Sequence, residues 1–273
     1  ASALLPVKRL SPVKKAVRKT ETARSDKQMS EKKVRCHIPV RSLAPNAITV
    51  LALCAGMFGI RFAYLENWEA AVTAILVAGV FDGLDGSVAR LLKGTSKFGA
   101  ELDSLSDVIS FGVAPALIMY MWVLSDVRGL GWLMSLVFAI CMALRLARFN
   151  TVMKDDELGA DVKAGYYTGI PAPASAALAL LPMILYFEYN FEFLKDPKIC
   201  SAYMAVICIL TVSRIPTFSF KSLKIHKEHV IFVLLGIGVL ASLIITDLWM
   251  TMSVIGMVYI ISIPTIAILS KKK

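Results

Sequence analysis

Four aspartates stand close together in a chain whose apolar segments otherwise carry little charge. Asp82 and Asp85 are three residues apart, and Asp103 and Asp107 are four residues apart, so each pair occupies one face of a helix. The segment LLKGTSKFG between the pairs predicts a turn, which would fold two helices into a hairpin and bring the acidic faces together. Carboxylates in one pocket repel one another unless protons or cations neutralise them, and carboxylate ligands suit Mg²⁺, Mn²⁺ or Ca²⁺. The spacing therefore predicts a site for two divalent ions, the arrangement that supports in-line attack at phosphorus.

Small and basic residues surround these aspartates. Arg90 offers a planar donor for phosphate oxygens, and Gly83, Gly86 and Gly99 leave space for a ligand against the helices. A single aspartate in an apolar helix is explained as readily by a hydrogen bond inside a bundle or by an ion pathway. Four at this spacing, flanked by glycines and an arginine, favour a metal-dependent site.

The elements that must position these residues are long apolar segments. The chain is 57% hydrophobic and 18% charged, whereas a soluble domain is about half apolar and about a quarter charged. Most of the apolar runs are long enough to cross about 30 Å of hydrocarbon as helices, and runs such as IFVLLGIGVLASLII lack the alternation of a barrel strand. The pattern predicts an all-α, polytopic transmembrane helix bundle. The eight runs are 43–63, 70–92, 99–124, 130–150, 170–189, 199–214, 230–246 and 248–269.

Basic residues predict how this bundle is oriented. With eight spans, 26 of the 30 Lys and Arg residues fall on the side that carries both termini. Because basic loops stay on the cytoplasmic side, both termini are expected in the cytoplasm. The net charge of +10 is then explained by attraction to anionic membrane lipids, with no need for nucleic acid.

The acidic hairpin resembles the signature of a known family. In the chain the pattern reads D-x-x-D-G-x-x-A-R-x8-G-x-x-x-D-x-x-x-D, from Asp82 to Asp107, with every position filled. This is similar to the CDP-alcohol phosphotransferases. The segment APNAIT at 44–49 is similar to the stretch that this family uses near the cytidine nucleotide.

The resemblance implies a role for each matching residue. Asp82, Asp85 and Asp103 would hold a first Mg²⁺ or Mn²⁺ ion. Asp107 would join the site of a second ion and act as the base for the acceptor hydroxyl, and Arg90 would bind the diphosphate. The other residues implied in binding CDP-diacylglycerol are Asn46, Thr49, Gly86, Ala89 and Gly99.

The resemblance also implies an architecture. The family fold is a core of six transmembrane helices, usually in a homodimer, with its site open to the cytoplasm. We therefore expect a bacterial cytoplasmic membrane protein with six core helices and about two extra ones. The expected parts are a basic arm with an interfacial lead-in at 1–42, a catalytic core at 43–214, and two further helices with a basic tail at 215–273.

Two further stretches, LRLARFN at 144–150 and GYYTGIPAPASAA at 165–177, resemble the serine-using members of the family. This resemblance implies transfer of a phosphatidyl group from CDP-diacylglycerol to L-serine, with release of CMP. Arg145 and Arg148 are three apart, and one of them could hold the serine carboxylate in a bidentate pair; we prefer Arg148 because it belongs to the matching stretch. Lys163 lies in a loop that could close over the acceptor. Anchoring at lipid headgroups explains the two arginines equally well.

Other functions stay open. Glycerol phosphate, inositol phosphate or choline could replace serine with the same chemistry. A cation transporter is less well supported, because the acids cluster in a single hairpin and the chain shows no matching pair of broken helices. An intramembrane prenyltransferase also uses acidic motifs, but these lie on well-separated helices and are not closely interspersed with glycine and arginine.

Overall fold

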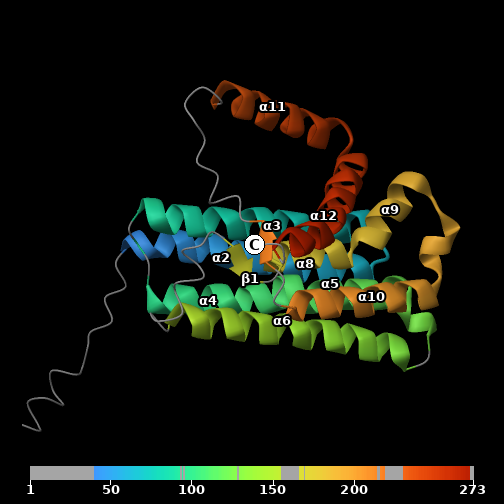
Figure 1. The fold of residues 1–273 in the computed structure, drawn as a ribbon. Helices are drawn as coiled ribbons and strands as arrows, with labels where there is room; N and C mark the ends of the chain where they lie inside the picture. The colour runs from blue at the N-terminus through green and yellow to red at the C-terminus, as the bar shows by residue number, and fades with distance from the viewer. Residues whose placement is uncertain are drawn as a thin grey trace, which may run out of the picture. The chain divides into compact units, whose positions relative to one another are not determined.

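The computed structural model describes residues 40–92, 94, 96–127, 129–154, 166–168, 170–213, 216–218 and 230–270. Within these residues the chain is helical apart from short turns and two three-residue strands (Figure 1). Residues 1–39, which make up most of the predicted basic arm and interfacial lead-in, lie outside the described residues. The helices are α2 (Val40–Tyr64), α3 (Trp68–Leu91), α4 (Lys97–Asp107), η1 (Val108–Val113), α5 (Ala114–Trp122), η2 (Leu124–Asp126), α6 (Leu130–Lys154), α8 (Ala172–Ala179), α9 (Leu181–Tyr189), η4 (Glu192–Lys195), α10 (Pro197–Val212), α11 (Val230–Thr246) and α12 (Leu248–Ser270).

Four helical segments are long and apolar enough to cross a membrane: α2, α3, the continuous stretch Lys97–Trp122, and α6. The pair α8 and α9 forms a fifth candidate if it counts as one bent span, and α10 and the apolar part of α12 are shorter. Each of the eight predicted apolar runs coincides with helical structure. The prediction of an all-α, polytopic helix bundle is therefore confirmed.

Helices α2 and α3 form a closely packed hairpin. The turn between them passes through Glu66, whose φ is 59°, and the Asn67 side chain caps α3 by accepting a hydrogen bond from the amide of Ala70. A Cβ at Gly59 would lie 2.9 Å from Ile75 Cδ1, so glycine allows the two backbones to approach. The hairpin fixes α3, which carries Asp82 and Asp85.

The third apolar run is one rod with a change of winding. Helix α4 passes into the π-helix η1 and then into α5, whose first turn contains Pro115. Proline cannot donate a backbone hydrogen bond, so a regular α-helix would lose one bond at this point. The π-turn begins directly after Asp107 and ends two residues before Pro115, and such turns are frequent at functional sites.

The fifth apolar run is broken. Helices α8 and α9 meet at an angle of 47° at Leu180, and Pro182 stands in the first turn of α9. The proline removes one backbone donor and its ring obstructs the preceding turn, which accounts for the bend. The apolar pattern predicts a single span at 170–189 and does not reveal this break.

Two loops contain an unpredicted pairing. Strands β1 (Tyr166–Thr168) and β2 (Pro216–Phe218) form an antiparallel two-stranded sheet in which Tyr166 pairs with Phe218. Both segments lie between the predicted apolar runs, where loops are expected. Three residues are too few for an alternating apolar pattern to stand out, so sequence periodicity gives no signal for such short strands.

The last helix packs against the rest of the described bundle. Helix α12 contacts α8, α9 and α11, and a Cβ at Gly256 would lie 2.5 Å from Leu181 Cδ1. Helix α10 packs along α6. The fully buried side chains at the centre come from several helices, among them Phe111, Phe138, Met183 and Met204.

Candidate active site

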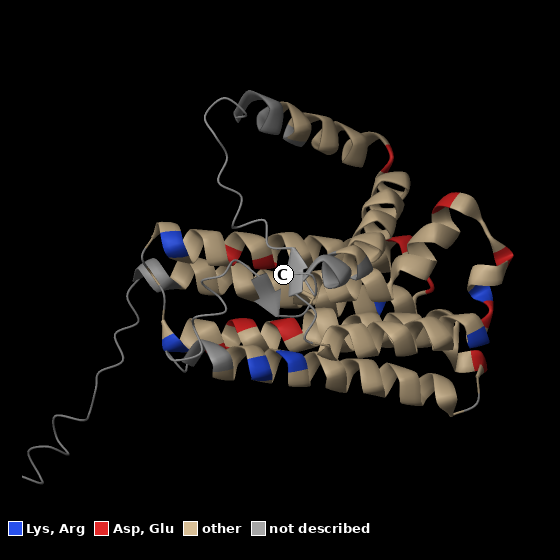
Figure 2. Cartoon of the chain, in the orientation of Figure 1, with Lys and Arg blue, Asp and Glu red and all other residues tan. Residues whose placement is uncertain are grey.

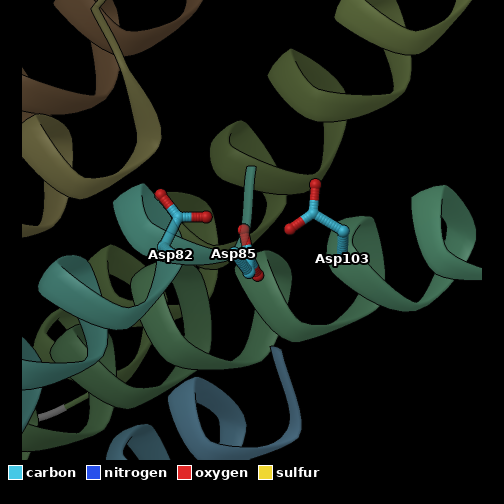
Figure 3. A group of neighbouring side chains, drawn as sticks. All are labelled: Asp82, Asp85 and Asp103. Atoms are coloured by element: carbon cyan, nitrogen blue, oxygen red, sulfur yellow. The ribbon is translucent and has the colours of Figure 1, made fainter. Parts of the chain in front are cut away.

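Three aspartates converge where α3 and α4 face each other. One carboxylate oxygen from each of Asp82, Asp85 and Asp103 lies within 4.8 Å of the other two. In Figure 3, Asp82 and Asp103 point toward each other, with Asp85 between them. Figure 2 shows acidic segments on both α3 and α4, with basic segments of α6 beside those of α4, while the remaining length of these helices carries little charge. The predicted hairpin and the meeting of its acidic faces are both present.

Local caps fix the two helices that carry the cluster. Beyond α3, the Gly94 amide donates to the carbonyl of Ala89 at 3.0 Å, which closes the end of the helix. The Ser96 side chain caps α4 by accepting a bond of 2.9 Å from the Gly99 amide. The turn is therefore short and defined at both ends, and it holds Asp103 opposite the aspartates of α3.

Asp107 lies beside this group of three. Its carboxyl group is close enough to that of Asp82 for a shared hydrogen bond, and its electrostatic neighbours include Asp103 and Arg145. It lies one helical turn beyond Asp103 and directly before the π-turn. The four predicted acids thus form one site, with Asp107 on its α6 side.

The donor set fits a hard divalent cation. Asp85 is only 6% exposed, and Asp82 and Asp103 are partly buried. Charged carboxylates this close in an apolar bundle are unfavourable unless cations or protons compensate them. Carboxylate oxygens are the ligands that Mg²⁺, Mn²⁺ and Ca²⁺ prefer. The cluster therefore has the composition of a site for such an ion.

Thr49 of α2 contacts the cluster through a hydrogen bond to Asp85. Its hydroxyl donates to Oδ2 of Asp85 at 2.7 Å, and it also lies 3.1 Å from the carbonyl of Pro45. Both Thr49 and Asp85 are buried. The bond fixes the rotamer of Asp85 and holds one of its oxygens, which leaves the other oxygen for a ligand.

A cavity of about 130 Å³ adjoins the acidic cluster. Its wall includes both Asp85 and Asp103, together with five of the six residues that the family resemblance implied in substrate binding. These five are Asn46, Thr49, Gly86, Ala89 and Gly99. A Cβ at Gly86 would meet no atom within 4 Å, so this glycine leaves open space, whereas one at Gly99 would lie 2.6 Å from Asn46 Oδ1.

The sixth of these residues, Arg90, points elsewhere. Its Nε donates to the carbonyl of Gly86 at 3.0 Å and its Nη2 lies 3.4 Å from Ser87 Oγ, so the guanidinium lies along its own helix. Arg90 does not line the cavity. It is exposed, and a change of rotamer is required before it can reach a ligand there.

The described residues predicted to bind the acceptor differ in their position relative to the acidic cluster. Arg145 lies beside Asp107 and near Tyr259 of α12, and its Nε is buried without a hydrogen-bond partner among the described residues. Arg148 is partly exposed on the same helix, one turn further along. Lys163 lies outside the described residues. Geometry thus favours Arg145 over Arg148 as the basic group nearest the acids.

Several supporting residues were not identified from the sequence. The Asn150 side chain donates to Ser104 Oγ at 2.9 Å, which ties α6 to the residue after Asp103. Ser106 and Ser110 donate to the carbonyls of Thr49 and Ala52, each at 3.3 Å. Ser106 and Ser110 are four residues apart, so their shared helical face was a usable signal. The approach of Tyr259 depends on how α12 packs and leaves no signal in the sequence.

These features define a class of protein: a polytopic helical membrane protein whose carboxylate-lined site suits a divalent cation and adjoins a small cavity. The sequence profile of the CDP-alcohol phosphatidyltransferase family matches residues 42–213, and a related profile, CDP-alcohol phosphatidyltransferase 2, matches residues 228–264. The chain belongs to the CDP-alcohol phosphatidyltransferase family.

Three relatives align with most of this chain. A CDP-diacylglycerol–serine O-phosphatidyltransferase of Mycobacterium leprae is 32% identical over 222 residues, which cover 81% of this chain and 73% of the relative. The protein of the same name from Mycobacterium bovis is 34% identical over 81% of this chain and 77% of its own. That from Helicobacter pylori strain 26695 is 38% identical over 71% of this chain and 79% of its own.

Proposed function

We propose that this protein transfers the phosphatidyl group of CDP-diacylglycerol to the hydroxyl of L-serine, giving phosphatidylserine and CMP. The observation that carries the proposal is the cavity beside the acidic cluster, because Asp85 and Asp103 belong to both. A nucleotide held in the cavity would have its diphosphate next to the carboxylates. The relatives that bear this activity in their names supply the two substrates.

In the proposed reaction the serine hydroxyl oxygen forms a bond to the phosphorus that carries diacylglycerol. The bond between that phosphorus and the bridging oxygen of the diphosphate breaks, and CMP leaves with the electron pair. Asp107 takes the hydroxyl proton as general base, a role for which a carboxylate must lie within hydrogen-bond reach of the hydroxyl. The approach of Asp107 to both Asp82 and Asp103 supports this assignment.

The proposed cofactor is Mg²⁺ or Mn²⁺, at two positions. Asp82, Asp85 and Asp103 would hold one ion, and Asp107 would contribute to the second. When bound, such ions neutralise diphosphate oxygens and stabilise the charge that develops on the leaving group. The protein contributes the fixed carboxylates, with Thr49 setting the orientation of Asp85.

Arg145 is the proposed partner of the serine carboxylate. A guanidinium binds a carboxylate through two parallel hydrogen bonds, and the buried Nε of Arg145 has no other partner among the described residues. Its neighbour Asp107 would then face the serine hydroxyl. Arg148 and Lys163 are proposed as secondary groups for the acceptor.

The test is a panel of acceptors with the purified, metal-loaded protein. With CDP-diacylglycerol and Mn²⁺ or Mg²⁺, labelled serine should yield a labelled lipid and an equal amount of CMP, and a chelator should abolish both. Glycerol 3-phosphate, inositol phosphate and choline should yield no lipid. A lipid product from one of these, with none from serine, would reject serine as the acceptor. Asp82→Asn is the matched inactive control.

The setting of the reaction is also proposed. We place the protein in the bacterial cytoplasmic membrane as a homodimer, with both termini in the cytoplasm and basic loops against anionic lipids. Residues 43–214 would form the catalytic core, with 1–42 as a basic arm and 215–273 as two additional helices. The charge asymmetry of the sequence supports this orientation.

A further inference from the structure

A second cavity, of about 120 Å³, lies between α3, α8, α9 and α12. Its ten lining residues are apolar apart from the hydroxyl of Tyr259. Apolar cavities of this kind stay dry and accept apolar groups. The cavity therefore suits hydrocarbon and rejects a phosphate, a sugar or an amino acid.

The cavity lies deeper along the helices than the acidic cluster. Leu76, on its α3 wall, precedes Asp82 by six residues, which is about 9 Å along the helix axis toward the N-terminal end of α3. On the opposite wall, Tyr259 lies near Arg145, which in turn lies beside Asp107. The cavity is thus connected to the cluster along α3 on one side and through Tyr259 and Arg145 on the other.

One stripe of α12 closes the cavity. Met252, Ile255, Gly256 and Tyr259 line it at the spacing of a single helical face. Gly256 allows α12 to approach Leu181 of α9 closely. The stripe gives α12 a contact with the substrate region, although the sequence alone marks this helix as an addition to the core.

We propose that this cavity receives one acyl chain of the CDP-diacylglycerol substrate, so that α12 forms part of the lipid site. This inference rests on the proposed function. In that reaction the phosphorus under attack is joined through glycerol to two acyl chains, and they must leave the acidic cluster toward the membrane interior. The cavity offers an apolar space at that depth, beside the residues of the site.

The first test fills the cavity. Ala177→Leu should lower kcat/KM for CDP-dioleoylglycerol by about tenfold, because the added side chain occupies the space of several methylenes. The same variant should keep kcat/KM for CDP-dihexanoylglycerol within about twofold of the parent value, since so short a chain ends before most of the cavity. Gly256→Ala adds a smaller group beside Leu181 and should shift the ratio in the same direction.

The control is Ala241→Leu, the same change at an exposed position of α11, which should leave both values unchanged. The inference is overturned if both filling variants keep the parental ratio, since the cavity would then be a packing gap or hold a lipid that is not the substrate. If the parent protein releases no CMP from either lipid, it is the proposed function that fails.

A second test needs no substitution. CDP-diacylglycerol with a diazirine in mid-chain, photolysed on the parent protein, should label the peptide that contains Met252 and Tyr259 or the facing peptide of α8 and α9. Labels confined to other helices would overturn the inference, and excess CDP-dioleoylglycerol should suppress the specific labels.

Discussion

At the scale of single residues, neighbouring polar groups fix the side-chain orientation of the aspartates. Thr49 shows this most directly. The family resemblance implies that it binds the nucleotide, and it does line the cavity, but its hydroxyl donates to Asp85. Loss of a group that orients a metal ligand typically lowers metal affinity or activity about 10- to 100-fold. Thr49 is therefore expected to act on the metal as well as on the nucleotide.

Thr49→Val tests this expectation, because it removes the hydroxyl and keeps the shape. The Mn²⁺ concentration for half-maximal CMP release should rise roughly tenfold, and turnover should recover substantially at saturating Mn²⁺. Thr73→Val is the matched control, since that hydroxyl bonds within α3 to the carbonyl of Glu69. A raised KM for CDP-diacylglycerol with an unchanged Mn²⁺ requirement would restrict Thr49 to the nucleotide.

Gly86 allows a second prediction at this scale. A Cβ at Gly86 or at Gly83 would meet no atom within 4 Å, but only Gly86 lines the cavity. Gly86→Ala and Gly83→Ala should both fold and gain up to about 1 kcal/mol of helix stability. Gly86→Ala alone should raise the KM for CDP-diacylglycerol about tenfold, which corresponds to about 1.4 kcal/mol of lost binding. Equal KM values in the two variants would contradict a ligand against Gly86, and thermal unfolding of both checks their folding.

The residues of the site were predictable to the extent that spacing on a helix determines position. The i, i+3 and i, i+4 pattern places the four aspartates on facing surfaces, and the family motif identifies five residues of the cavity wall. Side-chain rotamers follow from packing, which spacing does not encode. Arg90 lies along α3 for this reason, and Arg145, rather than Arg148, lies beside Asp107.

At the scale of elements, α4 depends on a few polar contacts. Ser106 is its single buried residue among those described, so apolar packing does little to fix its rotation. The bond from Asn150 to Ser104 links α4 to α6 next to Asp103, and Ser104 in turn donates to the carbonyl of Ala100. This link is expected to hold Asp103 toward the aspartates of α3.

Asn150→Ala should therefore lower the free energy of unfolding by about 1 kcal/mol and weaken activation by Mn²⁺ several-fold. Ser104→Ala should act through the same bond, so the double variant should be little worse than either single one. Thr151→Ala removes a hydroxyl that bonds locally to the carbonyl of Arg148 and should change neither quantity. Additive effects of Asn150→Ala and Ser104→Ala would show that their bond does not position Asp103.

The helices were predictable because apolar runs of this length have few alternatives in a membrane. The bends and π-turns that interrupt the helices were less predictable from the sequence. The bend at Pro182 and the π-turn before Pro115 follow from how proline interrupts backbone bonding, but proline in a membrane helix does not always bend it. The β1–β2 pairing joins segments about fifty residues apart, and local sequence carries no record of such a contact.

At the scale of the whole molecule, the acidic site lies on the same side of the membrane as the predicted basic loops. The acidic cluster lies in the halves of α3 and of the rod Lys97–Trp122 that face the predicted basic side of the membrane, and Figure 2 shows basic segments of α6 beside the acidic segments of α4. Cytoplasmic substrates such as serine and a CDP headgroup would then reach the site without crossing the bilayer. The acyl chains would remain in the hydrocarbon.

Orientation is the last prediction. A reporter fused after Lys273 should behave as cytoplasmic, whereas one inserted between Asn190 and Asp196, in the α9–α10 connection, should behave as external. The physical reason is that basic loops resist translocation, and 26 of the 30 Lys and Arg residues fall on the predicted cytoplasmic side. Green fluorescent protein, which fluoresces in the cytoplasm, and alkaline phosphatase, which is active outside it, report the two locations independently. Each fusion must retain CMP release, so that a misinserted protein is not scored. An active fusion with an external C-terminus would require either an odd number of spans beyond a cytoplasmic N-terminus or, with eight spans, an external N-terminus, which would place the acidic cluster on the wrong side for cytoplasmic substrates.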